Sequence, residues 1–255
     1  MTMPKPARDL ALRLGADPRR TPGPVRLTQS GELRLSVGSQ PWLNFDARHC
    51  MATSSCSFRW HARLWPFGWL SATHALQAGK GQHDVTALGT LPLSRGVPGL
   101  ALTRAAIVQY LADLPYAPDA MLHNPALLWR VVDANRLSVS CGMGAMRVDV
   151  IFALDADGRV ASAHAEGPAQ GATALLLPAP CHSQFFDYRR EHGRWVPFAT
   201  QGAWGVKGET LPCRRSNIDS WELTAAPRYF RPVWSSPLRT KAAAPHRFEE
   251  QRHEI

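Results

Sequence analysis

Two adjoining stretches decide the fold: Phe58-Arg59-Trp60-His61-Ala62-Arg63-Leu64 and, after a short connection, Leu70-Ser71-Ala72-Thr73-His74-Ala75-Leu76. In both, every second residue falls on a mainly apolar face, which is typical of β-strands that bury one side. If the two strands form a hairpin around residues 66–68, their apolar faces lie on the same side of the sheet. The predicted cross-strand pairs are Leu64 with Leu70, Ala62 with Ala72, and Trp60 with His74.

The same alternation recurs along most of the chain. Residues 42–49 and 146–154 each place apolar side chains on one face, and Asp155-Ala156-Asp157-Gly158 is a strong hairpin turn. Further strands are expected at 33–37, 84–93, 127–129, 136–141, 159–165, 185–189, 195–197 and 218–223. The sequence therefore predicts a mainly β (α+β) protein, built as a curved antiparallel sheet or an open half-barrel of hairpins.

One helix is expected to interrupt the strands and to cover the sheet as a lid. It is predicted over residues 102–114, with Thr103 as its cap and Pro115 and Pro118 beyond its end. Its apolar positions at helical spacing are Ala106, Ile107, Tyr110, Leu111 and Leu114.

Three segments make up the predicted domain organisation. Residues 1–26 are expected to form an amphipathic helix and a linker, and residues 27–225 a single β-rich domain that contains the inserted helix. Residues 226–255 are rich in Pro, Ala, Lys, Arg and Glu without periodicity, so this tail is expected to be disordered.

The chain carries a net charge of +9, but much of this charge lies in residues 1–26 and 238–255. The remaining Arg residues are scattered and form no basic stripe, so no specific nucleic-acid partner is expected. No apolar run is long enough for a transmembrane helix. Arg8, Asp9 and Arg13 interrupt the apolar segment at the N-terminus, which argues against a secretory signal and favours a cytoplasmic location.

Candidate ligand-binding residues lie on the predicted helix and the apolar strand faces. His74, opposite Trp60, could be a polar group at the bottom of a pocket, or a buried histidine bonded to a backbone carbonyl. Arg104 and Asp113 could bind the polar end of a ligand, or could join Asp133 in ion pairs that hold the helix. The full set of candidates is Trp60, His74, Arg104, Tyr110, Asp113 and Trp129.

No catalytic residue, metal ligand or cofactor is assigned. The residues with metal-binding chemistry lack the short spacing of known sites, and His61 lies between two arginines that repel a cation. These residues are His49, His61, His83 and Asp84. No nucleophile elbow, zinc-binding helix, phosphate loop or dinucleotide fingerprint follows a predicted strand.

Several motifs together resemble a family of uncharacterised bacterial proteins. They include Gln29-Ser30-Gly31-Glu32-Leu33-Arg34, Phe58-Arg59-Trp60-His61-Ala62 and the helix from Gln109 to Leu122. The resemblance spans roughly residues 25–225 and implies no established activity. The chain departs from the family pattern with Gln109, Asp113 and Tyr116, where Arg, Glu and Trp are usual. The strand–helix–strand order also looks like the open half-barrels that carry lipids or lipoproteins, a likeness of fold alone.

The leading hypothesis is a non-catalytic protein that binds an apolar small molecule or lipid, such as a fatty acyl chain, beneath the helix. Its simplest rival is the same fold with a filled core and no cavity. A second hypothesis is an enzyme on a small hydrophobic substrate that uses Asp113 or His74 as acid or base. A third is a protein-interaction module with a large exposed apolar patch. The oligomeric state stays open.

Overall fold

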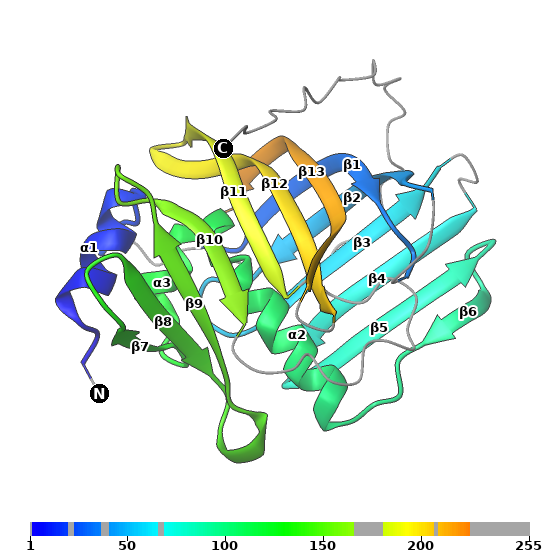
Figure 1. The fold of residues 1–255 in the computed structure, drawn as a ribbon, viewed down its shortest axis with the longest axis horizontal. Coiled ribbons are helices and arrows are strands. Elements are labelled where there is room, and N and C mark those ends of the chain that lie inside the picture. Colours follow the sequence, from blue (N-terminus) through cyan, green and yellow to red (C-terminus); the bar gives the residue numbers. More distant parts are fainter. Residues whose placement is uncertain are drawn as a thin grey trace.

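The computed structural model describes residues 2–19, 23–36, 41–65, 69–165, 181–206 and 209–224. The predicted tail at 226–255 lies outside the described residues. Within them, thirteen strands form one antiparallel sheet (Figure 1). The strands are β1 (Val25–Leu33), β2 (Leu43–Met51), β3 (Phe58–Leu64), β4 (Leu70–Gln77), β5 (Lys80–Ala87), β6 (Leu91–Arg95), β7 (Leu128–Val131), β8 (Arg136–Cys141), β9 (Val148–Leu154), β10 (Val160–Ala165), β11 (His182–Glu191), β12 (Arg194–Val206) and β13 (Glu209–Leu223).

The sheet consists of two meanders, β1–β6 and β7–β13, joined side by side at β1 and β13. Strands β6 and β7 are its two edges, and the strongly curved sheet is open between them (Figure 1). Both edges are short, which limits the backbone they offer for unwanted pairing. The predicted mainly β, antiparallel, open architecture is confirmed.

The predicted hairpin register is confirmed in full. Leu64 pairs with Leu70, Ala62 with Ala72 and Trp60 with His74 across β3 and β4. Burial alternates along β3, with Phe58, Trp60, Ala62 and Leu64 buried and the residues between them less so. This register places the apolar side chains of neighbouring strands on one side, here called the inner face, because one buried face admits only one register.

The helices are α1 (Lys5–Arg13), α2 (Leu100–Ala112), α3 (Pro118–His123) and two short 3-10 turns, η1 (Leu114–Tyr116) and η2 (Gly144–Met146). The inserted helix predicted at 102–114 is α2, which begins and ends two residues earlier. Thr103 is not its cap: Gly99 occupies that position, and the Thr103 hydroxyl instead accepts a hydrogen bond from the Gly81 N–H (3.2 Å).

Helix α2 lies against the inner face between the two halves of the sheet (Figure 1). It contacts β4 and β5 on one side and β8, β9 and β10 on the other. A helix in this position is enclosed by both meanders, and it covers the row of side chains described below. Among the helices of the described residues, none is long and apolar enough to cross a membrane.

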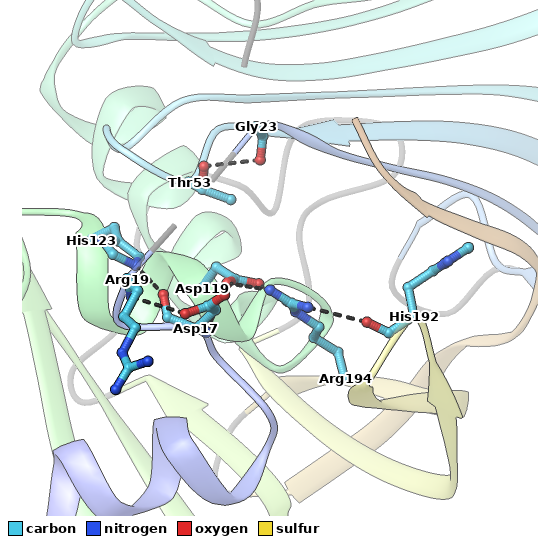
Figure 2. Close-up of polar contacts among 8 residues, drawn as sticks. All are labelled: Asp17, Arg19, Gly23, Thr53, Asp119, His123, His192 and Arg194. Atoms are coloured by element: carbon cyan, nitrogen blue, oxygen red, sulfur yellow. Dashed lines mark hydrogen bonds and ion pairs between the residues drawn. The ribbon is translucent and has the colours of Figure 1, made fainter. Parts of the chain in front are cut away.

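A buried carboxylate fixes the N-terminal segment to the body of the protein. Asp119 at the start of α3 accepts hydrogen bonds from the Arg194 guanidinium (2.9 and 3.1 Å) and from the Asp17 N–H (3.1 Å). The His123 ring donates to the Asp17 carbonyl (2.7 Å), and Figure 2 shows these groups converging. The apolar side of α1 joins the common core through Ala7, Leu10, Ala11 and Leu14.

Candidate functional site

A row of four rings crosses the inner face from β2 to β5. His49 lies opposite Trp60, Trp60 opposite His74, and His74 opposite His83 in the strand register. The ring centroids of Trp60 and His74 are 5.5 Å apart, and those of His74 and His83 are 4.1 Å apart, all edge-to-face. Three imidazoles on a mainly apolar, largely buried sheet face are unusual, because polar side chains are costly to bury.

The C-terminal end of α2 places a carboxylate beside this row. The Gln109 amide donates a hydrogen bond of 2.6 Å to Oδ2 of Asp113. Nε2 of His49 lies 3.8 Å from the same oxygen, which is too long for a hydrogen bond. This Nε2 is fully buried and has no hydrogen-bond partner among the described residues. A single oxygen atom could bridge the two groups.

Arg214 of β13 brings a positive charge to the same place. It pairs in register with Leu33 of β1 and Gly202 of β12, and its guanidinium carbon lies 6.0 Å from the centre of the Trp60 ring. Its Nε is buried without a hydrogen-bond partner. In the part of the chain that the structure describes, Arg214 makes no ion pair.

Aromatic side chains surround these polar groups. The Tyr116 hydroxyl bonds the Thr200 hydroxyl, and the Tyr116 carbonyl accepts a hydrogen bond of 2.8 Å from the Trp221 indole. The His49 ring packs edge-on against Phe58 (5.7 Å) and Tyr116 (6.4 Å). His49, Asp113 and Arg214, here called the inner polar cluster, therefore lie among aromatic side chains.

Burial shifts the proton affinities of this cluster in opposite directions. Burial raises the pKa of Asp113 to about 6, although Arg214 and the Gln109 hydrogen bond lower it. Burial, helped by the charge of Arg214, lowers the pKa of His49 to about 3. His49 is therefore neutral at pH 7, whereas Asp113 can take up a proton close to neutrality.

Two predicted ligand contacts hold α2 in place. The Tyr110 hydroxyl donates to the Ala52 carbonyl (3.0 Å) and accepts from the Asn124 amide (2.9 Å). Arg104 donates to the carbonyls of Ala145 (2.7 Å) and Arg147 (2.8 Å) in the β8–β9 connection. Together with the Thr103–Gly81 bond, these contacts fasten α2 to both halves of the sheet.

The other predicted residues are distributed more widely. Trp60 and His74 lie in the inner row, His74 half-buried between two rings. Trp129 lies on the edge strand β7 and packs against Phe152 at 6.0 Å. Asp133 does not help to hold the helix: it pairs with Arg136 in its own turn, 2.6 Å away, so that interpretation is wrong for Asp133.

The residues with metal-binding chemistry are divided between the two faces of the sheet. His49 and His83 lie in the inner row, whereas His61 bonds the Thr73 hydroxyl (3.0 Å) on the outer face. Asp84, next in the outer register, lies 3.4 Å from Arg95.

His49 and Arg214 were not among the predicted ligand-binding residues, although the sequence contained a signal for His49. Continuing the alternation of Leu43, Phe45 and Ala47 by one step places His49 on the apolar face. Arg214 gave no such signal, because only its pairing with β1 and β12 shows which side it faces.

The family comparison agrees with the resemblance that the sequence motifs indicated. No curated protein matches the sequence. Among solved structures, a LolA superfamily protein from Nitrosomonas europaea is similar, with 10% sequence identity and a TM-score of 0.46 over 87% of this chain and 94% of that chain. This likeness concerns the general fold and says nothing about a ligand. A family of unknown function, DUF6544, matches residues 1–215, and the chain therefore belongs to DUF6544.

Proposed function

We propose that this protein is a non-catalytic binder of an apolar ligand, such as a long acyl chain, held on the inner face beneath α2. The observation that carries this proposal is the position of a mainly apolar helix between the halves of an open sheet. Helices that are apolar on all sides belong in buried surroundings. Leu100 at the start of α2 is exposed, so the helix covers the opening while its N-terminal end stays in contact with solvent.

The attachments of α2 favour movement at its N-terminal end. Tyr110 anchors the C-terminal half in the core, whereas the polar contacts of Thr103 and Arg104 are hydrogen bonds to main-chain groups at the two sides of the opening. Gly99 lies directly before the helix, and a side chain added there would meet only the Val97 carbonyl, at 4.0 Å. The chain is therefore free to bend there.

The energies permit exchange between helix and ligand. Ala106 and Ile107 are buried side chains of α2, and burial of a large aliphatic side chain contributes roughly 1.5–3 kcal/mol. An acyl chain of about 15 methylenes, at about 0.8 kcal/mol each, contributes about 12 kcal/mol on burial. Such a ligand can thus replace the burial that the N-terminal half of α2 gives up when it moves.

Native mass spectrometry of the purified protein, with uptake of the neutral apolar dye Nile red, tests the proposal. We expect a co-purified mass in the lipid range, or saturable dye binding that the bound lipid competes away. A ligand-free mass together with no dye uptake would overturn the proposal and leave a filled core as the correct interpretation.

A further inference from the structure

The inner polar cluster contains hydrogen-bonding capacity that the protein does not use. Nε of Arg214 and Nε2 of His49 are both buried, and neither has a partner among the described residues. Buried polar atoms of proteins are nearly always hydrogen-bonded, so two such atoms in one cluster point to a missing acceptor. Arg214 always donates, and neutral His49 donates in the tautomer that carries its proton on Nε2.

The charge at Arg214 selects the kind of acceptor. Its guanidinium stays ionised and has no carboxylate within ion-pair distance in the described residues. Asp113, whose charge interacts with that of Arg214, instead accepts its hydrogen bond from Gln109 and becomes protonated below about pH 6. A single anionic group is therefore the ligand that Arg214 lacks.

The number of positive charges favours a carboxylate over a phosphate. Arg214 supplies one positive charge and His49 supplies none at neutral pH. A phosphomonoester carries about −1.5 to −2 charges, which would leave excess negative charge beside Asp113. A monocarboxylate is matched by Arg214 alone, and its planar oxygens suit the guanidinium fork.

The surroundings of the cluster supply the apolar remainder of the ligand. Phe58 and Tyr116 pack on His49, the Trp60 ring lies under Arg214, and α2 covers the row. Resting on the proposed function, we infer that the inner polar cluster is the head-group site for a carboxylate-bearing amphiphile of the fatty-acid type. Arg214 and His49 bind the carboxylate, and Asp113 takes up one proton as the anion arrives.

Proton uptake by Asp113 makes the affinity for the anion depend on pH. Two carboxylates side by side cannot both remain ionised, so binding of the anion favours protonated Asp113. The groups that face Asp113 are His49 from β2, Gln109 from its own helix, Arg214 from β13 and Tyr116 from η1. Above pH 6 the affinity for the acid should fall by up to about tenfold per pH unit.

A matched pair of fluorescent probes tests the inference: cis-parinaric acid and its neutral methyl ester, which share one polyene chain. The wild-type protein should bind the acid at pH 6 roughly tenfold or more tightly than the ester, and lose this preference towards pH 8. Arg214→Gln should weaken binding of the acid roughly 10- to 100-fold and leave the ester unchanged. Arg63→Gln, an exposed arginine on the outer face, is the matched control and should change neither.

The outcomes separate the two proposals. If neither probe binds, the proposed function fails and the head-group site fails with it. If both probes bind equally at every pH, apolar binding stands and the head-group site is overturned. The pH profile of the wild-type protein decides this without any variant, and thermal melting of Arg214→Gln shows whether the variant is folded.

Discussion

His49 and Asp113 respond to pH in opposite directions, although their side chains lie 3.8 Å apart. The native pKa of Asp113, about 6, is above its unfolded value of 3.8, so the folded state binds more protons between these values. The native pKa of His49, about 3, is below its unfolded value of 6.5, so the folded state binds fewer. Stability therefore falls through Asp113 and rises through His49 as pH increases from about 4 to 6.

Replacing the Asp113 carboxylate should reveal how His49 alone contributes to the pH dependence of stability. Asp113→Asn removes a buried charge, and we expect a free energy of unfolding at pH 7 that is higher by roughly 2–3 kcal/mol. Below pH 6.5 the variant should lose stability more steeply than the wild type, because Asp113 no longer offsets the titration of His49. Urea unfolding at pH 4–7 measures both effects, with the exposed Glu222→Gln as control. An unchanged stability at pH 7 would contradict the assigned burial cost.

Replacing the histidine should reduce the loss of stability in acid. In His49→Gln the titration of Asp113 is no longer offset by His49, so as pH falls from 6 to 4 the free energy of unfolding should fall less than in the wild type. The same urea series measures it. A variant that loses as much stability as the wild type over this interval would show that His49 is not the group that resists protonation.

At the scale of elements, the polar contacts of α2 control its opening. Arg104→Gln removes the two hydrogen bonds to Ala145 and Arg147, so the start of the helix should open more often. We expect faster amide exchange over residues 100–106 and faster uptake of Nile red, with little change in final dye affinity. Arg130→Gln, an exposed arginine on β7, is the control. Equal exchange rates in both variants would argue against a moving lid.

Asp119 should be the most sensitive point in the attachment of α1. Asp119→Ala leaves Arg194, only 11% exposed, without its carboxylate, and loss of one partner of a buried pair costs about 3–5 kcal/mol. We expect this loss in urea unfolding, with early proteolysis before residue 25. Asp133→Ala breaks an exposed pair and should destabilise the protein far less. Similar losses in the two variants would refute the role given to Asp119.

Strands and helices could be predicted where a short-range sequence pattern alone determines them. Alternation identified β3, β4 and β9, and helical spacing identified α2 to within two residues. Thr103 misled as a cap because Gly99 starts the helix earlier and the hydroxyl finds a partner on β5 instead. The inner polar cluster draws on β2, α2 and β13, and no local pattern reports that residues 49, 113 and 214 meet.

At the scale of the whole molecule, exposed apolar side chains border the opening of the sheet. Val97 is 83% exposed just before α2, and Met143 is 89% exposed in the β8–β9 connection that Arg104 binds. Leu91 and Leu93 are exposed on the edge strand β6. Such a border is suited to contact with an apolar source of ligand.

We expect this border to govern the rate of ligand transfer more than affinity. The triple variant Leu93→Ser, Val97→Ser and Met143→Ser should slow transfer of cis-parinaric acid from phospholipid vesicles while its equilibrium affinity stays the same. Stopped-flow fluorescence measures the rate. The double variant Leu12→Ser and Phe186→Ser changes exposed apolar residues that lie outside the two edge strands and serves as control. Equal slowing in both would show that no particular border is used.

The pairing of β1 with β13 also determines the order in which the sheet can fold during synthesis. Every other neighbouring pair in the sheet is consecutive along the chain, so each meander can form from local hairpins as it leaves the ribosome. The pairing of Val25 with Leu223 must wait until nearly the whole sheet has been made. Until then the nascent chain consists of two separate meanders, whose apolar faces are not yet packed against a shared core. These are the species that a chaperone would bind.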